Sequence, residues 1–428
     1  MSSLNGVTVV THIQPEKVES VREQLRQLEK ALENEDTLFE KSLTTHFARW
    51  VILDRTDHEE LGHFAPTLIF ASNFDGPVDE YLLSLIDLDF EWLNQLYGNC
   101  EGVPTGGFPN STGLYDYLIR FQVDINCYYR AHFGRTAQII RKEALLREEL
   151  EKYIDEKKEE WGRQSASLVR QDIQNYVRNN PDLHWAVIEP VWEKSPWWYR
   201  ATPWVLGALI VFFILSLNLF VTCVLAFGVF LWYLRRSECA EQQHSEQVDP
   251  GLFSALVDKE DHIVQNQMTS VTYIKPTLFR RYLLRFVLFS INFLAVTVFR
   301  DGRLGLITTI HFARWIIIDD DRRLVFFSNF DGSWENYLGD FIDRASEGLT
   351  SIWTNTIGFP DTKFLIWGGS RDELRFKNYA RNSQVVTDFW YSAYRDLSCE
   401  NVINNSQIRA GLVGELSEQE AQEWLRRF

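Results

Sequence analysis

The chain has few cysteines, and they follow no metal-binding or disulfide pattern. None of them forms a C-x-x-C pair; the five are Cys100, Cys127, Cys223, Cys239 and Cys399. Without such spacing the sequence predicts neither a disulfide framework nor a zinc site. We therefore expect no bound metal ion and a reducing compartment.

Other familiar signals are also missing. The glycines at Gly102, Gly106 and Gly107 have no Gly-Lys-Ser/Thr after them, and no Gly-x-Ser-x-Gly is present, so neither a phosphate loop nor a hydrolase nucleophile is predicted. The first residues are neither basic nor apolar, which argues against a cleaved signal peptide. A formal net charge of −16 disfavours binding to phosphate groups, and we expect no nucleic-acid partner.

A long-range repeat is what the chain does contain. The pentapeptide His-Phe-Ala-Arg-Trp occurs at His46–Trp50 and again at His311–Trp315, an offset of 265 (311 − 46). Ser-Asn-Phe-Asp-Gly follows each copy, at Ser72–Gly76 and Ser328–Gly332. Gly-Phe-Pro and Tyr-x-Ala landmarks then recur in the same order, the latter at Tyr129 and Tyr391. Repetition in this order indicates duplication of a whole domain.

Each copy reads as β-α-β-β-α followed by a further strand and helix. Alternating and β-branched runs mark the strands, and Pro15, Ser333 and Ser417 are placed to open helices. We expect the long charged helical stretch after the first copy to cover that domain. The predicted strands are Val7–Ile13, Thr44–Leu53, Thr67–Phe74 and Gln384–Tyr394; the predicted helices are Glu16–Leu32, Val78–Ile86, Thr136–Asn179 and Leu416–Phe428.

This duplicated order resembles the ferredoxin-like halves of the dimeric α/β-barrel superfamily, in which two sheets face one another and enclose a pocket. The resemblance implies an α+β fold: two ferredoxin-like units packed as an intramolecular barrel pseudo-dimer, with an inserted membrane hairpin. The expected divisions are residues 1–180 for the first unit with its long helix, 181–250 for a membrane-embedded segment and 251–428 for the second unit.

The membrane prediction rests on the apolar run Pro203–Leu234, which holds no Asp, Glu, Lys, Arg or His. At ~1.5 Å per residue it would reach about 48 Å as one helix, longer than a ~30 Å bilayer core. A single span and a hairpin turning near Ser216–Asn218 both remain open, and we favour the hairpin. Aromatic and basic residues flank the run as interfacial anchors: Trp197, Trp198, Tyr199, Arg200, Trp232, Tyr233, Arg235 and Arg236.

A second apolar stretch, Phe286–Phe299, replaces the polar first helix of the other copy. Arg280, Arg281 and Arg285 precede it. We interpret it as an interfacial amphipathic helix lying on the bilayer, with a third span as the alternative. Both folded units are then expected on one side of the membrane, at its cytoplasmic face, with the lipid bilayer as partner.

The residues that could carry chemistry lie in the repeated segments. On a regular strand His46, Ala48 and Trp50 share one face and Arg49 points to the other; the second copy has His311 and Arg314. A His can act as a base or as a metal or haem ligand. The alternative is structural: a His bonded within the fold, and Arg49 paired with a carboxylate such as Asp75. Because both copies keep both residues, we favour the structural role.

The Asn-Phe-Asp-Gly element also resembles the Gly-x-x-Asp-Gly motif of the dye-decolorising peroxidases, with Ser72 and Ser328 in place of the first glycine. That resemblance implies haem as a possible cofactor, with Asp75 or Asp331 handling peroxide. No His follows Asp331, so an iron ligand would have to be His132, with Arg135 beside it.

Two functions remain in view from the sequence. One is a membrane-held binding or scaffolding protein whose pocket takes a lipophilic small molecule, lined by Phe70, Phe74, Phe326, Phe327, Phe330 and Trp390. The other is an oxidoreductase acting on such a molecule through His46 or His311 and the neighbouring arginine.

Overall fold

The computed structural model places strands and helices along most of the chain. The residues it describes are 4–34, 36–132, 134–188, 204–205, 207–208, 211, 217–240, 247–297 and 307–428. Most of the first arm of the expected membrane hairpin, with its turn at Ser216, lies outside them.

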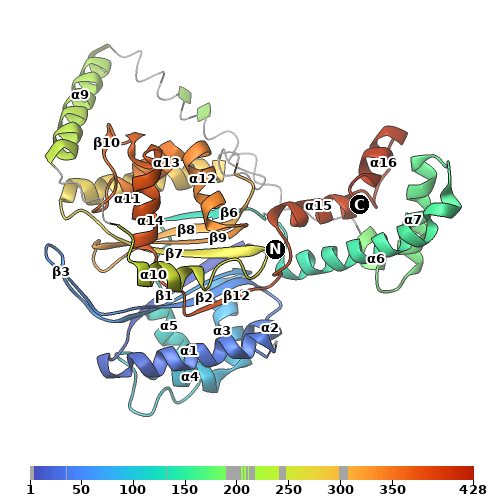
Figure 1. Ribbon diagram of the computed structural model, residues 1–428, viewed down its shortest axis with the longest axis horizontal. Coiled ribbons are helices and arrows are strands. Elements are labelled where there is room, and N and C mark those ends of the chain that lie inside the picture. Colours follow the sequence, from blue (N-terminus) through green and yellow to red (C-terminus); the bar gives the residue numbers. More distant parts are fainter. Residues whose placement is uncertain are drawn as a thin grey trace.

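Two four-stranded antiparallel sheets form the centre of the molecule (Figure 1). The first has the order β1 (Leu4–His12), β5 (Thr67–Asp75), β2 (Thr45–Leu53) and β12 (Phe389–Ser392). The second has the order β6 (Cys127–Arg130), β8 (Ile310–Ile318), β9 (Arg323–Asp331) and β7 (Gln265–Tyr273). An α+β class with antiparallel sheets, as predicted from the sequence, is confirmed.

The repeated segments occupy equivalent places in the two sheets. Ala48 lies opposite Ser72 in the first sheet, and Ala313 lies opposite Ser328 in the second. The central hairpin predicted from Thr44–Leu53 and Thr67–Phe74 is therefore confirmed. The longer connection in the first copy forms a small added hairpin of β3 (Thr56–His58) and β4 (Gly62–Phe64).

Each unit gives its last strand to the other unit's sheet. β6 follows the first copy but pairs with β8, and β12 follows the second copy but pairs with β2. Before it crosses, each segment also bonds to its own sheet: the Val123 amide donates to Thr8 O at 2.9 Å, and the Val385 amide donates to Thr269 O at 3.0 Å. Hydrogen bonds thus connect the two sheets along both edges.

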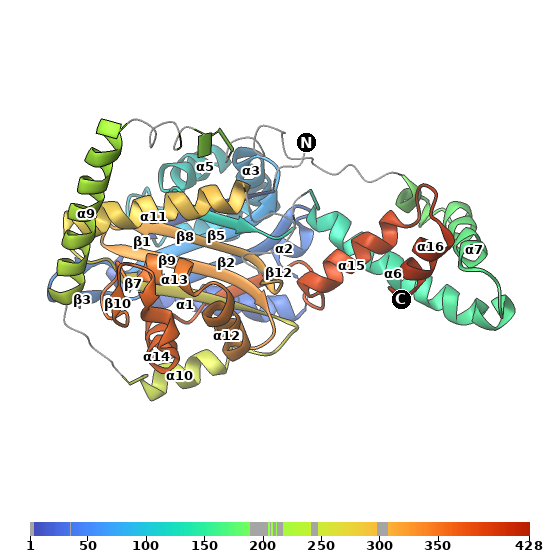
Figure 2. The same cartoon turned by 90° about the horizontal axis from the view of Figure 1, so that it is seen from above.

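Helices cover the outer face of each sheet, so that the sheets are the two inner layers (Figures 1 and 2). On the first sheet lie the 3-10 turn Pro15–Lys17 and α1 (Val18–Glu33), α2 (Leu38–Lys41), α3 (Val78–Leu88), α4 (Phe90–Tyr97) and α5 (Ser111–Arg120). On the second lie α11 (Leu278–Thr297), α12 (Trp334–Arg344), α13 (Ser346–Trp353) and α14 (Glu373–Ser383), with α10 (Pro250–Val257) beside them. The expected N-cap of α12 is confirmed, because Ser333 accepts from the Asn336 amide.

Apolar side chains fill the space between the sheets. One buried cluster joins residues of the two inner faces: Val51, Leu53, Ile69, Ala71, Ile316, Ile318, Val325 and Phe327. Trp390, also expected to line a ligand pocket, borders a surface hollow with Thr387 and Arg395. Four others of that set pack elsewhere, Phe70 and Phe74 under the first helical layer and Phe326 and Phe330 under the second. These side chains meet each other in close-packed cores, which corrects their assignment to a pocket.

A helical arm projects from one end of the sheets (Figures 1 and 2). It consists of α6 (Ala137–Trp161), α7 (Ala166–Asn179), the 3-10 turn His184–Val187, α15 (Cys399–Ala410) and α16 (Glu418–Leu425), which share a hydrophobic core of their own. The predicted helicity and the Ser417 cap are confirmed. The expectation that the charged stretch covers the first domain is wrong, because its apolar positions, such as Leu146 and Leu150, pack against the C-terminal helices.

One helix from the apolar run, α9 (Leu217–Ala240), stands beside α11 (Figure 2). Its C-terminal turn is attached to a short hairpin of β10 (Thr362–Lys363) and β11 (Trp367–Gly368), which precedes the 3-10 turn Gly369–Arg371. Glu238 accepts hydrogen bonds there from the amides of Phe364 and Leu365. Among the described residues, none of the helices has both the length and the apolar character that crossing a bilayer requires.

Candidate functional site

The two repeated histidines each lie against the aspartate of their own copy. His46 Nε2 is 3.2 Å from Asp75 Oδ1, and His311 Nε2 is 2.7 Å from Asp331 Oδ1. The His311 contact is aligned as a hydrogen bond, whereas the His46 contact is close but misaligned. Both rings are fully buried. The structure thus brings together two pairs of the predicted residues.

A β-bulge decides where these histidines point. The register of each central hairpin shifts between residues 45 and 47 in the first sheet and between 310 and 312 in the second. An extra residue at such a point is turned out of the regular alternation. The His46 ring therefore lies 5.5 Å from that of Phe312 in the other unit, rather than with Ala48 and Trp50 on the helical side. The expected shared face is wrong for His46, although it holds for Ala48 and Trp50.

The second oxygen of each aspartate caps a helix of the arm. Asp75 Oδ2 accepts from the Ala137 amide, the first residue of α6, and Asp331 Oδ2 accepts from the Cys399 amide, the first residue of α15; both bonds are 2.8 Å. A carboxylate at a helix N-terminus satisfies a free N–H and opposes the positive end of the helix dipole. These aspartates therefore hold a histidine and a helix terminus together, and do not cap the helices that directly follow them.

The repeated arginines lie between the sheets and join them. Arg49 donates to the carbonyls of Met268 and Ser328, each at 2.9 Å, in the opposite sheet. Arg314 makes the reciprocal bonds, to Val7 O at 2.8 Å and to Ser72 O at 2.7 Å. The expected pairing of Arg49 with Asp75 is wrong, since the guanidinium points across the interface.

Burial lowers the pKa of both arginines. Burial, and then the charge of Arg314, lower the pKa of Arg49 to about 9. Burial likewise lowers the pKa of Arg314. A pKa of about 9 still leaves Arg49 protonated at neutral pH. Oxygens of Gln267, Thr269 and Asn329 also accept hydrogen bonds from its Nη1 and Nη2 groups. Donors committed in this way are not free for a substrate.

The serines of the repeat also have a structural part. Tyr81 Oη lies 2.6 Å from Ser72 Oγ, and the equivalent Tyr337 donates to Ser328 Oγ at 2.6 Å. Each tyrosine stacks on the phenylalanine of its own Asn-Phe-Asp-Gly segment, with ring centroids 3.8 Å apart in both copies. A glycine at these serine positions, as in the peroxidase motif, would remove the hydrogen bond.

The two copies differ in the residue that contacts Nδ1, the second ring nitrogen of the histidine. His46 Nδ1 lies 2.9 Å from Tyr394 Oη, whereas His311 Nδ1 lies 2.8 Å from His132 Nε2. Tyr394 and His132 are equivalent, because the offset of 262 (391 − 129) that aligns Tyr391 with Tyr129 also aligns them. The same offset aligns Cys399 with Ala137. Extending the Tyr-x-Ala alignment by these few residues would have exposed the difference, which the sequence reading missed.

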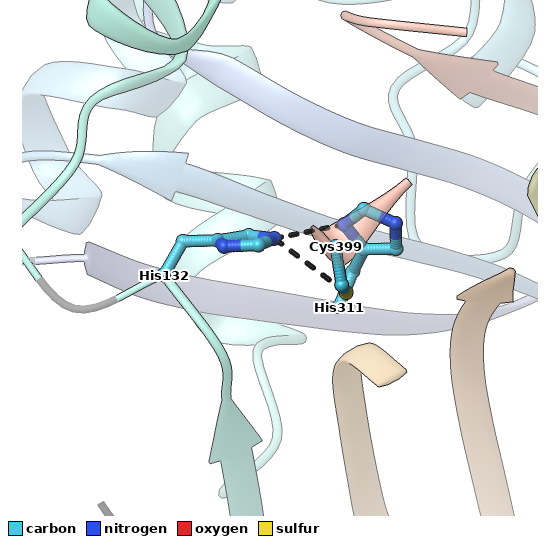
Figure 3. Close-up of side chains that lie close together, drawn as sticks. All are labelled: His132, His311 and Cys399. Atoms are coloured by element: carbon cyan, nitrogen blue, oxygen red, sulfur yellow. Dashed lines mark hydrogen bonds between the residues drawn. The ribbon is translucent and has the colours of Figure 1, made fainter. Parts of the chain in front are cut away.

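Cys399 completes a cluster in the second copy only (Figure 3). Its Sγ lies 3.9 Å from His132 Nε2. One ligand-type atom each from His132, His311 and Cys399 all lie within 4.8 Å of one another, and all three residues are buried. The short spacing rules used on the sequence could not detect this group, because its members come from the end of β6, from β8 and from the start of α15.

Burial governs the protonation of this cluster. Burial, followed by His311 and Arg135, lowers the pKa of His132 well below its ordinary value. Burial and then the Asp331 carboxylate raise the pKa of the Cys399 thiol well above its ordinary value. Both shifts favour the uncharged form of the group concerned.

The environment of His132 does not fit haem. Its Nε2 is occupied by His311, and the rings of Phe312 and Tyr394 lie 6.3 and 6.4 Å from its own. The neighbouring Arg135 is directed to Ser406 of α15, to which its Nε donates at 3.1 Å. An axial ligand needs an open face for a porphyrin, and these contacts occupy it.

Comparison with known proteins adds no relatives. No family model, no curated protein and no solved structure matches the chain.

Proposed function

We propose that this chain is a membrane-attached, non-catalytic scaffolding or binding protein that rests on a lipid bilayer through α9 and α11. A stripe of large apolar side chains on α11 carries the proposal. Leu278, Tyr282, Phe286 and Phe289 are each between 66% and 70% exposed. Their spacing of three and four residues places them along one face of the helix.

The opposite face of α11 is also apolar. Leu284 and Leu288 are fully buried in the core under the second sheet. A surface helix normally has one apolar stripe and one polar face. A helix with two apolar faces therefore needs a second apolar environment, which a bilayer supplies.

α9 extends the same surface. The Tyr233 and Phe230 rings lie 4.7 and 6.0 Å from that of Phe279 at the start of α11. Further along, α9 exposes a set of large apolar side chains: Val221, Val224, Leu225, Phe227, Val229 and Trp232. Arg236 stacks over Trp232 at 5.6 Å, an aromatic and basic pair suited to the headgroup region.

The exposed apolar surface of α9 and α11 is large enough to bind a bilayer. Burying one large apolar side chain contributes roughly 1.5–3 kcal/mol. Summed over the exposed apolar side chains of α9 and α11, transfer from water to lipid would contribute well over ~10 kcal/mol. This sum is an upper estimate. Continuity with the uncharged run Pro203–Leu234 favours a bilayer over a second copy of the chain as the occupant.

The exchanged strands support a single aqueous side for both units. Because β6 and β12 each lie in the sheet of the other unit, the two units form one body. An even number of membrane passes by the apolar run, such as a hairpin, satisfies this arrangement. The same strand exchange and the face-to-face sheets support our interpretation of the fold as a ferredoxin-like pseudo-dimer of the α/β-barrel kind. The free cysteines still favour the cytoplasmic face.

A flotation experiment with phosphatidylcholine and phosphatidylserine vesicles tests the proposal. The full chain should float with the vesicles. A variant carrying Leu225→Asn, Val229→Asn, Phe286→Asn and Phe289→Asn should lose at least about 10-fold in bound fraction, since each change removes apolar burial.

The matched control carries Leu145→Asn and Leu168→Asn, exposed leucines of the helical arm, and should float like the wild type. Equal flotation of the fourfold variant, or a wild-type chain that ignores vesicles and forms a stable dimer, would refute the proposal.

The oxidoreductase alternative has less support. It requires an accessible histidine with a free arginine, whereas both histidines are fully buried and both arginines bond across the sheets. A pocket for a lipophilic molecule between the sheets also lacks support, because the apolar cluster described above fills that space.

A further inference from the structure

The structural role assigned to the repeat does not explain why His132, His311 and Cys399 lie together. The first copy shows what that role needs: a histidine, its aspartate and a tyrosine at the equivalent of His132. In the second copy the tyrosine is replaced by His132, and Ala137 is replaced by Cys399. Both replacements introduce a side chain that can bind a metal ion, and both occur around the same histidine.

We propose that His132 Nε2, His311 Nδ1 and Cys399 Sγ bind a thiophilic d10 metal ion, Zn²⁺ or Cu⁺. Imidazole nitrogen with thiolate sulfur is a donor set that selects these ions over Mg²⁺, Ca²⁺ or Mn²⁺. The three donor atoms lie within 4.8 Å of one another, and each comes from a different element of the fold.

The donor separations are close to those of a metal site. Ligands at about 2.0–2.3 Å from a tetrahedral ion are separated by about 3.3–3.6 Å. The observed separations of His132 Nε2 are 2.8 Å to His311 Nδ1 and 3.9 Å to Cys399 Sγ. Shifts of about half an ångström would bring these two separations to the values of a metal site. The third separation, from His311 Nδ1 to Cys399 Sγ, is at most 4.8 Å.

Asp331 supplies the outer support that metal-bound histidines usually have. Its Oδ1 holds Nε2 of His311, so that the Nδ1 lone pair of His311 faces the other donors. Its Oδ2 accepts from the amide of Cys399 and fixes the start of α15. One carboxylate thus positions two of the three ligands.

The protons balance in a simple way. His132 Nδ1 is buried and has no hydrogen-bond partner among the described residues, so it can take the ring proton when Nε2 binds the ion. The Cys399 thiol gives up its proton to solvent and binds as thiolate. Binding therefore releases a single proton, and no oxidation or reduction is required.

Metal titration of the full chain in detergent, after treatment with a chelator, tests the assignment. Zn²⁺ and Cu⁺ are each titrated in competition with a chromophoric chelator, and Co²⁺ serves as a spectroscopic substitute for Zn²⁺. We expect one ion per chain and a thiolate-to-cobalt charge-transfer band. The competition arms distinguish Zn²⁺ from Cu⁺ as the preferred ion.

The first copy supplies the variants. Cys399→Ala and His132→Tyr each introduce the residue that the equivalent position already carries, so the fold should accept them. Each should abolish stoichiometric binding, and Cys399→Ala should also abolish the charge-transfer band. Asp331→Asn should weaken binding about 10-fold or more. Cys127→Ala, at another buried cysteine, should leave binding unchanged.

Two results would overturn the proposal. One is a wild-type chain that takes up no ion at one equivalent and gives no charge-transfer band. The other is binding that persists in both Cys399→Ala and His132→Tyr. The charge-transfer band of the wild-type chain reports a thiolate ligand without any variant. The proposal can therefore be tested even if a variant fails to fold.

Discussion

Arg49 and Arg314 show how a charged residue can hold two sheets together without a carboxylate partner. Each guanidinium is buried and bonds to backbone carbonyls of the opposite sheet. Hydrogen bonds from a charged donor contribute about 1.5–3 kcal/mol, and a buried acceptor left unpaired costs about 1–3 kcal/mol. The retention of both arginines is therefore explained by stability.

Arg49→Ala should lower the free energy of unfolding by at least about 3 kcal/mol, because the Met268 and Ser328 carbonyls lose their donor inside the interface. Arg49→Lys should recover only part of this, since an ammonium cannot reproduce the planar fork. Urea unfolding followed by circular dichroism measures both.

Arg26→Ala is the control, because Arg26 is exposed on α1 and makes a long contact of 3.5 Å with Glu23. It should change stability by less than about 0.5 kcal/mol. Similar losses for Arg26→Ala and Arg49→Ala would show that the bonds between the sheets do not stabilise the fold.

At the scale of elements, the exchanged strand β12 is fixed at its start by one carboxylate. Asp388 Oδ2 accepts from the Ile52 amide of β2 at 2.7 Å, and Oδ1 accepts from Arg22 of α1 at 3.2 Å. Burial raises the pKa of Asp388 from 3.8 to about 6, and Asp54 adds to this; the Ile52 amide, Arg22 and Lys259 oppose it. The folded chain thus holds this proton more tightly than the unfolded chain.

The sign of the pH dependence follows. Between pH 3.8 and about 6 the folded state binds more protons, so this contribution to stability is full below pH 3.8 and is lost as pH rises through about 6. A shift of this size corresponds to about 3 kcal/mol. Asp388→Asn, which does not titrate, should therefore gain stability relative to wild type as pH rises from 4 to 7.

Unfolding free energies of the two proteins at several pH values measure this difference. Asp36→Asn, at an exposed carboxylate, is the control and should track the wild type. A constant difference between Asp388→Asn and wild type across the range would contradict the prediction.

For the whole molecule, the strand exchange is the decisive feature. The first sheet is incomplete without β12, and the second is incomplete without β6. An isolated unit would expose the edge of its central hairpin and half of the core between the sheets. The two exchanged strands therefore connect both sheets into one body.

Fragments of residues 1–188 and 247–428 should consequently aggregate or remain unfolded when expressed separately. Co-expressed, they should form a one-to-one complex that co-purifies through a tag on either fragment. Circular dichroism and size-exclusion chromatography distinguish these outcomes. Two fragments that each fold cooperatively as monomers would contradict the exchanged arrangement.

The amino-acid pattern alone was enough to find the repeat, the α+β class, the central hairpins and the helices α1, α3, α12 and α16. These follow from local signals: alternation in the strands, Pro15 before α1, and the caps Ser333 and Ser417. Local signals act over a few residues and can be read in order along the chain.

Which residues contact one another became clear from the folded arrangement. A bulge turned His46 and His311 out of the expected face. The face-to-face packing of the two sheets brought Arg49 to Met268 instead of Asp75. The helix terminus at Cys399 was brought to His132 across 267 positions (399 − 132). Such contacts depend on strand register and on the packing of distant elements. Neither can be deduced from the spacing of residues that are close in sequence.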